Sequence, residues 1–210
     1  MKKKEDQSIK TIEEFESAVM ESMKAMFGNC ARRKGVLRSL AEHLGVADTG
    51  VIVEAAFEAG LDPDVPYPIL HFHTTLATDI DEELIPGVLK GLNDLNTVIS
   101  AGSYPAFGCF GFYAPLRQIY LTYRMPVNAY VLEAEYSNVM LYLSSLQESL
   151  DLFADFILFL SSTGHQITLE AYMDFLDVVA DMNDLEKRLD YLDQFLKESE
   201  EKDKKEQQTD

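Results

Sequence analysis

Two histidines have the residue type and spacing that come closest to a chemical site. His71 and His73 lie two positions apart in a stretch rich in β-branched and aromatic residues, which predicts a β-strand. Side chains two apart on a strand point to one side of it, so this pair could form half of a metal site with Asp79 or Asp81 nearby. A closed site needs a third or fourth ligand, and no Cys or further His is spaced to supply it. We therefore expect two ordinary sheet histidines, with a metal-dependent enzyme or binder centred on His71 and His73 as the alternative.

The two cysteines, Cys30 and Cys109, are too few and too far apart for a disulfide framework, so we expect free thiols in a reducing compartment. Cys109 lies among aromatic residues and is predicted to be a small core residue. Cys30 precedes Arg32 and Arg33, which would favour a thiolate. A nucleophile also needs a positioned base, which the sequence does not indicate.

Neither the carboxylates nor the glycines form a catalytic pattern. The acidic residues at 79, 81, 82 and 83 have the placement of charges that complement a helix N-terminus. Residues 107–111 carry two glycines but lack the Lys and the following helix of a phosphate-binding loop. We therefore expect no catalytic residues and no cofactor.

Hydrophobic periodicity predicts an alternation of helices and hairpins. The expected elements are helices over about 11–28 and 36–45, a hairpin of 51–58 with 67–77 around a turn at 60–64, a helix from about 79 to 101, a hairpin of 104–113 with 118–125, and a helix over about 132–160 with a possible break near Ser149. In the second hairpin, Ile119, Leu121, Tyr123 and Met125 alternate with polar positions, which indicates one buried face.

A last helix is predicted from Thr168 to 198, with apolar residues spaced alternately three and four apart. They are Phe175, Val178, Met182, Leu185, Leu189, Leu192 and Leu196. This is a heptad pattern, which could fold back on the core or join two chains. From Ser199 the chain is polar and is predicted to be a disordered tail.

Composition limits the class of protein. The chain has 210 residues, 18 Lys and Arg and 36 Asp and Glu, hence a net charge of −18. Such a balance argues against nucleic acid as a partner, because phosphate contacts need clustered basic residues. No apolar run reaches the length of about 20 residues that a membrane span needs, and no apolar segment follows the basic start. We expect a cytoplasmic protein that does not enter membranes.

These patterns predict an α+β fold, in which an antiparallel sheet of four or more strands packs against helices. The expected organisation is a flexible N-terminus at 1–10, a core domain at 11–164, a helix at 165–198 packed on the core or on a partner chain, and a disordered tail at 199–210.

Residues from about 69 to 164 resemble the YbjN and type III secretion chaperone-like families. The features that carry the likeness are the helix end at 92–96 (Leu-Asn-Asp-Leu-Asn), the entry to a hairpin at 102–104 (Gly-Ser-Tyr), the closing strand at 119–127 that ends in Met-Pro-Val, and the long helix after it. The heptad helix after residue 168 departs from that pattern. The resemblance implies a small cytoplasmic α+β protein, often dimeric, that binds other proteins rather than catalysing a reaction.

We therefore predict a non-enzymatic protein-binding module, chaperone-like or regulatory, from a homodimer. It would bury a partner segment on an aromatic sheet face or in a helix groove. The candidate partner-binding residues are Phe107, Phe110, Phe112, Tyr120, Tyr123, Leu185, Leu189 and Leu192. A structural assembly protein that acts through the C-terminal helix is a further alternative.

Overall fold

The computed structural model describes residues 9–58, 68–102, 107–164, 167–180, 182 and 185–206. Within these ranges, six strands form one antiparallel sheet in the order β1-β2-β3-β4-β6-β5. The strands are β1 (Ala31–Arg33), β2 (Val36–Leu44), β3 (Thr49–Glu58), β4 (Ile69–Ala77), β5 (Cys109–Tyr113) and β6 (Gln118–Pro126). The α+β prediction is confirmed.

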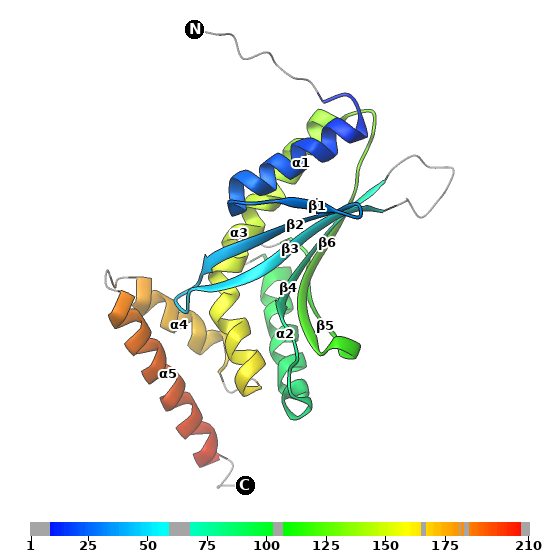
Figure 1. Ribbon diagram of the computed structural model, residues 1–210. Helices are drawn as coiled ribbons and strands as arrows, with labels where there is room; N and C mark the ends of the chain where they lie inside the picture. The colour runs from blue at the N-terminus through cyan, green and yellow to red at the C-terminus, as the bar shows by residue number, and fades with distance from the viewer. Residues whose placement is uncertain are drawn as a thin grey trace.

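The helices are α1 (Ile12–Phe27), α2 (Ile85–Ser100), α3 (Leu132–Thr163), α4 (Leu169–Ala180) and α5 (Leu185–Glu206), with short 3-10 turns at Glu82–Leu84 and Ala114–Leu116. In Figure 1, α1 lies beside the first half of α3 and α2 lies by the second half. Helix α4 runs back along the second half of α3, and α5 lies on the outer side of α4. None of the helices within the described residues is both long and apolar enough to cross a membrane.

Helix α1 begins and ends where its sequence predicts. The Thr11 hydroxyl accepts the Glu14 backbone N–H, and the Glu14 carboxylate accepts the Thr11 N–H in return. Gly28 ends the helix in the left-handed conformation, with φ of 78°. Phe15 and Val19 on the inner face are fully buried.

Strand β2 corrects the prediction of a helix over 36–45. Leu37, Ser39, Ala41 and Leu44 are buried, which is strand periodicity with one irregular step. The register with β3 shifts between Ala41 and Leu44, and His43 in this bulge has a positive φ of 61°. His43 therefore lies on this strand.

Both predicted hairpins are present. Strands β3 and β4 pair over Ile52 to Glu58, and the predicted turn at 60–64 lies outside the described residues. Strands β5 and β6 pair with Phe110 opposite Leu121. The first arm of this hairpin is described from residue 107 onward. Pairing brings alternate residues to one inner face that packs against the helices.

The exposed edge of β5 is closed by a helix side chain. The Phe110 N–H donates to Asn96 Oδ1 at 2.9 Å, and Asn96 Nδ2 donates to the Phe110 carbonyl at 2.8 Å. Asn96 on α2 thus occupies both outward backbone groups of Phe110, which a further strand would otherwise pair with. At the other end of the sheet, β1 has three residues, all exposed, and two of them are arginines.

Helix α3 runs without a break through Ser149 and holds the turn between β2 and β3. Asp155 on α3 is fully buried and accepts the backbone N–H groups of Val46 at 2.7 Å and Ala47 at 3.0 Å. The exposed Asp151, one helical turn earlier, accepts the Gly45 N–H at 3.0 Å. Two carboxylates from one helix therefore hold three successive turn amides.

The single heptad helix predicted from 168 to 198 is two helices, α4 and α5. The Phe175 ring on α4 stacks on Tyr191 at 5.6 Å and contacts Phe195 at 4.9 Å, so α5 packs against α4 within the chain. Helix α5 also continues to Glu206, which corrects the tail predicted from Ser199.

Candidate functional site

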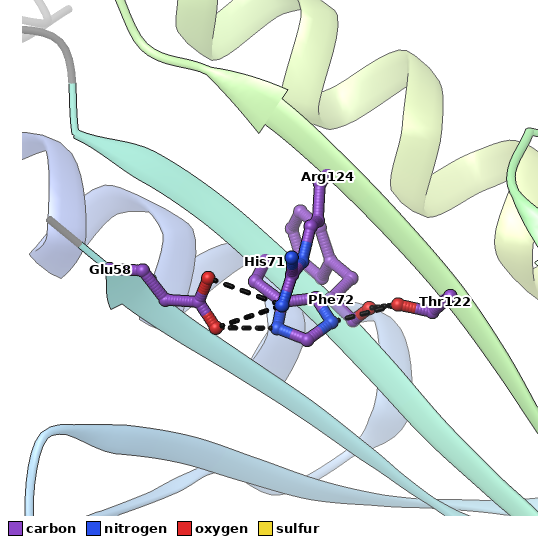
Figure 2. Close-up of polar contacts among 5 residues, drawn as sticks. All are labelled: Glu58, His71, Phe72, Thr122 and Arg124. Carbon is purple, nitrogen blue, oxygen red and sulfur yellow. Dashed lines mark hydrogen bonds and ion pairs between the residues drawn. The ribbon is translucent and has the colours of Figure 1, made fainter. Parts of the chain in front are cut away.

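His71 and His73 share the outer face of the sheet, as their spacing predicts. Their ring centroids are 6.1 Å apart on β4. Figure 2 shows His71 between Glu58 and Thr122 from the two flanking strands. His71 Nδ1 lies 2.8 Å from Glu58 Oε1, and Nε2 lies 2.8 Å from Thr122 Oγ1. Both ring nitrogens of His71 are therefore occupied by protein groups.

The side chains around this histidine pair form contacts between neighbouring strands. Arg124 forms an ion pair with Glu58 at 3.4 Å, beside the His71 contact (Figure 2). The His73 ring stacks on Tyr120 with centroids 5.1 Å apart. Burial, and secondarily the charge of His71, lower the pKa of His73, so its neutral form is favoured. Within the described residues, no group of three or more His, Cys, Asp or Glu side chains could hold a metal ion.

The predicted aromatic sheet face does not exist as one surface. Phe110 and Phe112 point inward, where the Phe110 ring contacts Phe153 of α3. Tyr120 lies on the outer face beside His73. Residues of a strand that are an odd number apart lie on opposite faces, so Tyr120 and Tyr123 could not have shared one.

Two of the predicted aromatic residues do come together, in a groove between β6 and α3 that we call the docking groove. The Phe107 and Tyr123 rings are 6.1 Å apart, and Tyr123 stacks on Tyr142 of α3 at 4.5 Å. Phe107 is 43% exposed and Leu141 is 60% exposed. The groove is lined by Phe107, Tyr123, Met125, Pro126, Glu135, Asn138, Leu141 and Tyr142.

A buried hydroxyl lies in the wall of the docking groove. Tyr142 is 2% exposed, and within the described residues its hydroxyl has no hydrogen-bond partner. Burial raises the pKa of Tyr142 above the ordinary value, so the phenol stays protonated and able to donate. Glu135 supplies the acidic side of the groove, where its carboxylate accepts the Asn128 N–H at 3.3 Å.

The remaining predicted residues lie elsewhere. Leu192 is buried within the chain, whereas Leu189 on the same helix is 41% exposed. Leu185 begins α5, but its side chain lies outside the described set. Cys109 is exposed, which corrects the prediction of a core thiol. The reason is its register, since Cys109 pairs with Thr122 and so lies on the outer face.

Sequence reasoning missed the helical wall of the docking groove. Leu141 and Tyr142 lie in an apolar stretch of α3 and have no local mark that separates them from core residues. The one available signal is that Leu141 lies off the helical apolar face formed by Val139, Leu143 and Leu146. A large apolar residue on the exposed side of a helix indicates a possible contact surface.

Comparison with known proteins gives no relative: no family model, no curated protein and no solved structure matches the chain.

Proposed function

We propose that this protein is a non-enzymatic protein-binding module, chaperone-like or regulatory, that buries an apolar partner segment in the docking groove. The observation that carries the proposal is the combination, in one groove, of the exposed apolar side chains of Phe107 and Leu141 with the carboxylate of Glu135. The resemblance of residues 69–164 to chaperone-like families supports the same class of function.

Exposed apolar groups supply the driving force. Full burial of a Leu or Phe side chain is worth about 1.5–3 kcal/mol, and Leu141 and Phe107 each still expose about half of that surface. Burying both beneath a partner side chain would therefore contribute on the order of 2 kcal/mol.

Charge defines the partner further. The chain carries a net charge of −18, and Glu135 lines the groove. A segment with apolar side chains and an adjacent Lys or Arg would be attracted to this surface, and an acidic segment would be repelled. We thus propose a basic, apolar segment of another protein as the occupant, bound in the cytoplasm.

A homodimer is a second part of this proposal. Leu189 is exposed on α5 while its neighbour Leu192 packs inward, so the helix retains an apolar position that a second copy could cover. An assembly role through this helix is the alternative function that the same observation supports.

Site-specific photo-crosslinking tests the groove. A benzophenone amino acid replaces Leu141 in one variant and Leu116, which is equally exposed outside the groove, in the control. The expected result is a crosslink to a discrete partner segment from position 141 only. A synthetic peptide of that segment should lose at least tenfold in affinity with Leu141→Ser, about 1.4 kcal/mol, and stay within twofold with Leu116→Ser. Equal crosslinking from both positions, or equal affinities, would contradict the proposal.

The metal-dependent alternative has its own test. Replacing both His71 and His73 by Ala should leave affinity for that peptide within about tenfold. Elemental analysis of the purified protein provides the second readout. One equivalent of zinc, iron, nickel or copper that is lost in the double variant would favour the enzyme or metal-dependent binder instead.

A further inference from the structure

The two strands of the second hairpin differ in length at the end beside the docking groove. Pairing between β5 and β6 stops at Cys109 opposite Thr122, whereas β6 continues to Pro126. Gly108 accounts for the stop, because its φ of 110° lies outside the extended conformation of a strand. The last four residues of β6, which span about 13 Å, therefore have β4 on one side and no described strand on the other.

The direction of the hydrogen bonds shows which backbone groups of β6 face this opening. Neighbouring residues of a strand turn their N–H and C=O groups to opposite sides. The N–H and C=O of Phe110 point away from β6, to Asn96, so those of Leu121 opposite point toward β4. The Val127 N–H keeps that direction and donates at 2.8 Å to the carbonyl just before β4. Arg124 has the other parity, so its N–H and C=O face the opening, where no described strand pairs with them.

The residue that ends β6 supports the same assignment. Proline has no N–H to donate, and within sheets it is confined to positions where that N–H would face an unpaired edge. Pro126 lies two residues after Arg124 and faces the same side. Asn96 closes the neighbouring edge of β5 at Phe110, so the opening is confined to the end of β6.

The docking groove lies along this opening. Tyr123 and Met125 line it from β6 and Leu141 lines it from α3, and its volume is about 370 Å³. Residues directly opposite each other on antiparallel strands point to the same face of the sheet. A strand placed beside the end of β6 would therefore direct alternate side chains, those opposite Tyr123 and Met125, into the groove.

Charge gives such a strand a direction. Glu135 lies at the far end of the groove, where it accepts the N–H of Asn128 just after β6, whereas Tyr142 stacks on Tyr123 at the near end. Within the described part of the chain, no Lys or Arg forms an ion pair with Glu135. An antiparallel strand would run from the Glu135 end to the Tyr123 end. A basic residue would therefore come first in it, and apolar residues would follow.

We propose that the partner segment binds as a short antiparallel strand on the open end of β6, with a basic residue followed by apolar residues two and four positions later. Backbone hydrogen bonds to Arg124 hold the strand, and the three alternate side chains enter the docking groove. This inference rests on the proposed function of the groove, and it adds the conformation, the direction and the sequence pattern of the occupant.

A synthetic peptide tests the sequence pattern. The peptide is acetyl-Thr-Lys-Thr-Leu-Thr-Val-Thr-amide carrying a fluorophore, and binding is measured by fluorescence anisotropy. The control is the reversed sequence, Thr-Val-Thr-Leu-Thr-Lys-Thr, which has the same composition and the same alternation. We expect saturable binding of the first peptide and at least fivefold weaker binding of the second. No saturable binding of the first, or equal affinities, would overturn the proposal.

N-methylation of single amides tests the conformation. In the proposed register the fifth residue of the peptide lies opposite Arg124, and its N–H donates to the Arg124 carbonyl, whereas the N–H groups of the fourth and sixth residues face solvent. N-methylation of the fifth residue should lower the affinity at least tenfold, and N-methylation of the fourth or sixth should stay within threefold. Equal losses at the fourth and fifth residues would refute a bound strand.

Two pairs of protein variants complete the test. Arg124→Pro removes the N–H that faces the opening, and Arg124→Ala removes the same side chain but keeps that N–H, so the first should bind the peptide at least fivefold more weakly than the second. Equal affinities would contradict the backbone contact. Leu141→Ser with Leu116→Ser separates the two proposals. A selective loss with Leu141→Ser but no alternation in the N-methyl series would retain the groove and refute the strand, whereas equal binding by both Leu variants would count against the groove itself.

Discussion

Replacing Asp155 by Ala is expected to destabilise the fold through the turn between β2 and β3. The carboxylate is fully buried and accepts two turn N–H groups, those of Val46 and Ala47. Without it, both amides lose the acceptor that holds them in the turn, and the Val46 amide is buried. The turn would then have to rearrange or leave donors unpaired inside the protein.

The expected magnitude follows from these two bonds. A hydrogen bond to a charged group contributes about 1.5–3 kcal/mol, which sets an upper range of about 3–6 kcal/mol for the pair. Burial raises the pKa of Asp155 despite the lowering effect of the two amides, so the ionised carboxylate is itself disfavoured where it lies. Removing it relieves that cost, and we therefore expect a loss at the lower end, about 3 kcal/mol.

Urea unfolding at pH 7 provides the assay, with Asp151→Ala as the matched control. Asp151 is exposed and accepts only the Gly45 N–H, so its loss should cost about 0.5–1.5 kcal/mol. The slopes of the two unfolding curves should agree, which would show that the same surface is exposed on unfolding. Losses for the two variants that agree within about 0.5 kcal/mol would refute the role assigned to the buried carboxylate.

The pH dependence gives a second readout of the same group. Because the folded-state pKa lies above the ordinary value of 3.8, the folded protein binds this proton more tightly than the unfolded chain does. The contribution of Asp155 to stability therefore falls as pH rises from 3.8 through the folded pKa, and is constant above it. Asp155→Ala should remove that component from a stability profile, whereas Asp151→Ala should retain most of it, because burial raises the pKa of Asp155 more than the charge of Asp151 does.

Three further predictions concern the core, the outer sheet face and α5. Leu121→Ala, on the buried face of β6, should cost about 2–5 kcal/mol by urea unfolding, and Leu116→Ala, in the exposed turn before β6, within about 0.5 kcal/mol. Equal losses would contradict the burial of Leu121. The pKa of His73 in the folded protein is lowered from 6.5, so as pH falls the unfolded chain protonates at this histidine before the folded protein does. The free energy of unfolding therefore declines below pH 6.5. His73→Gln should flatten that decline, and an unchanged pH profile would argue against it. Leu192→Glu should lower the stability of the protein and leave its mass in light scattering unchanged. Leu189→Glu should lower that mass if α5 joins two chains. A wild-type protein that is already monomeric at micromolar concentration would refute the homodimer proposal.

The sequence predicted most of the elements, and its main error has a physical cause. In β2 the buried residues are Leu37, Ser39, Ala41 and Leu44, because a bulge inserts one residue between the last two. Leu37, Ala41 and Leu44 therefore show the spacing of four and three that is typical of a helix. A bulge depends on pairing with β3, and such pairing is not visible in a local pattern.

The docking groove was predictable only in part. Phe107 and Tyr123 stood out because aromatic residues are dense around the second hairpin. Their partners Leu141 and Tyr142 come from a helix that crosses the sheet, so the contact depends on tertiary packing. Asp155 could have been noticed as a charge within the apolar face of α3, although its amide partners are more than 100 positions away in sequence.

The amide of Asn96 has a consequence for the behaviour of the protein at high concentration. An unprotected strand edge is a template for adding strands from other molecules, which leads to aggregates. Here Asn96 occupies both backbone groups of Phe110 at one margin of the sheet, and the three-residue, arginine-bearing β1 ends the other. Polymerisation edge to edge is thereby discouraged at both margins. The protein can therefore keep the apolar side chains of its groove accessible without aggregating through its sheet edges.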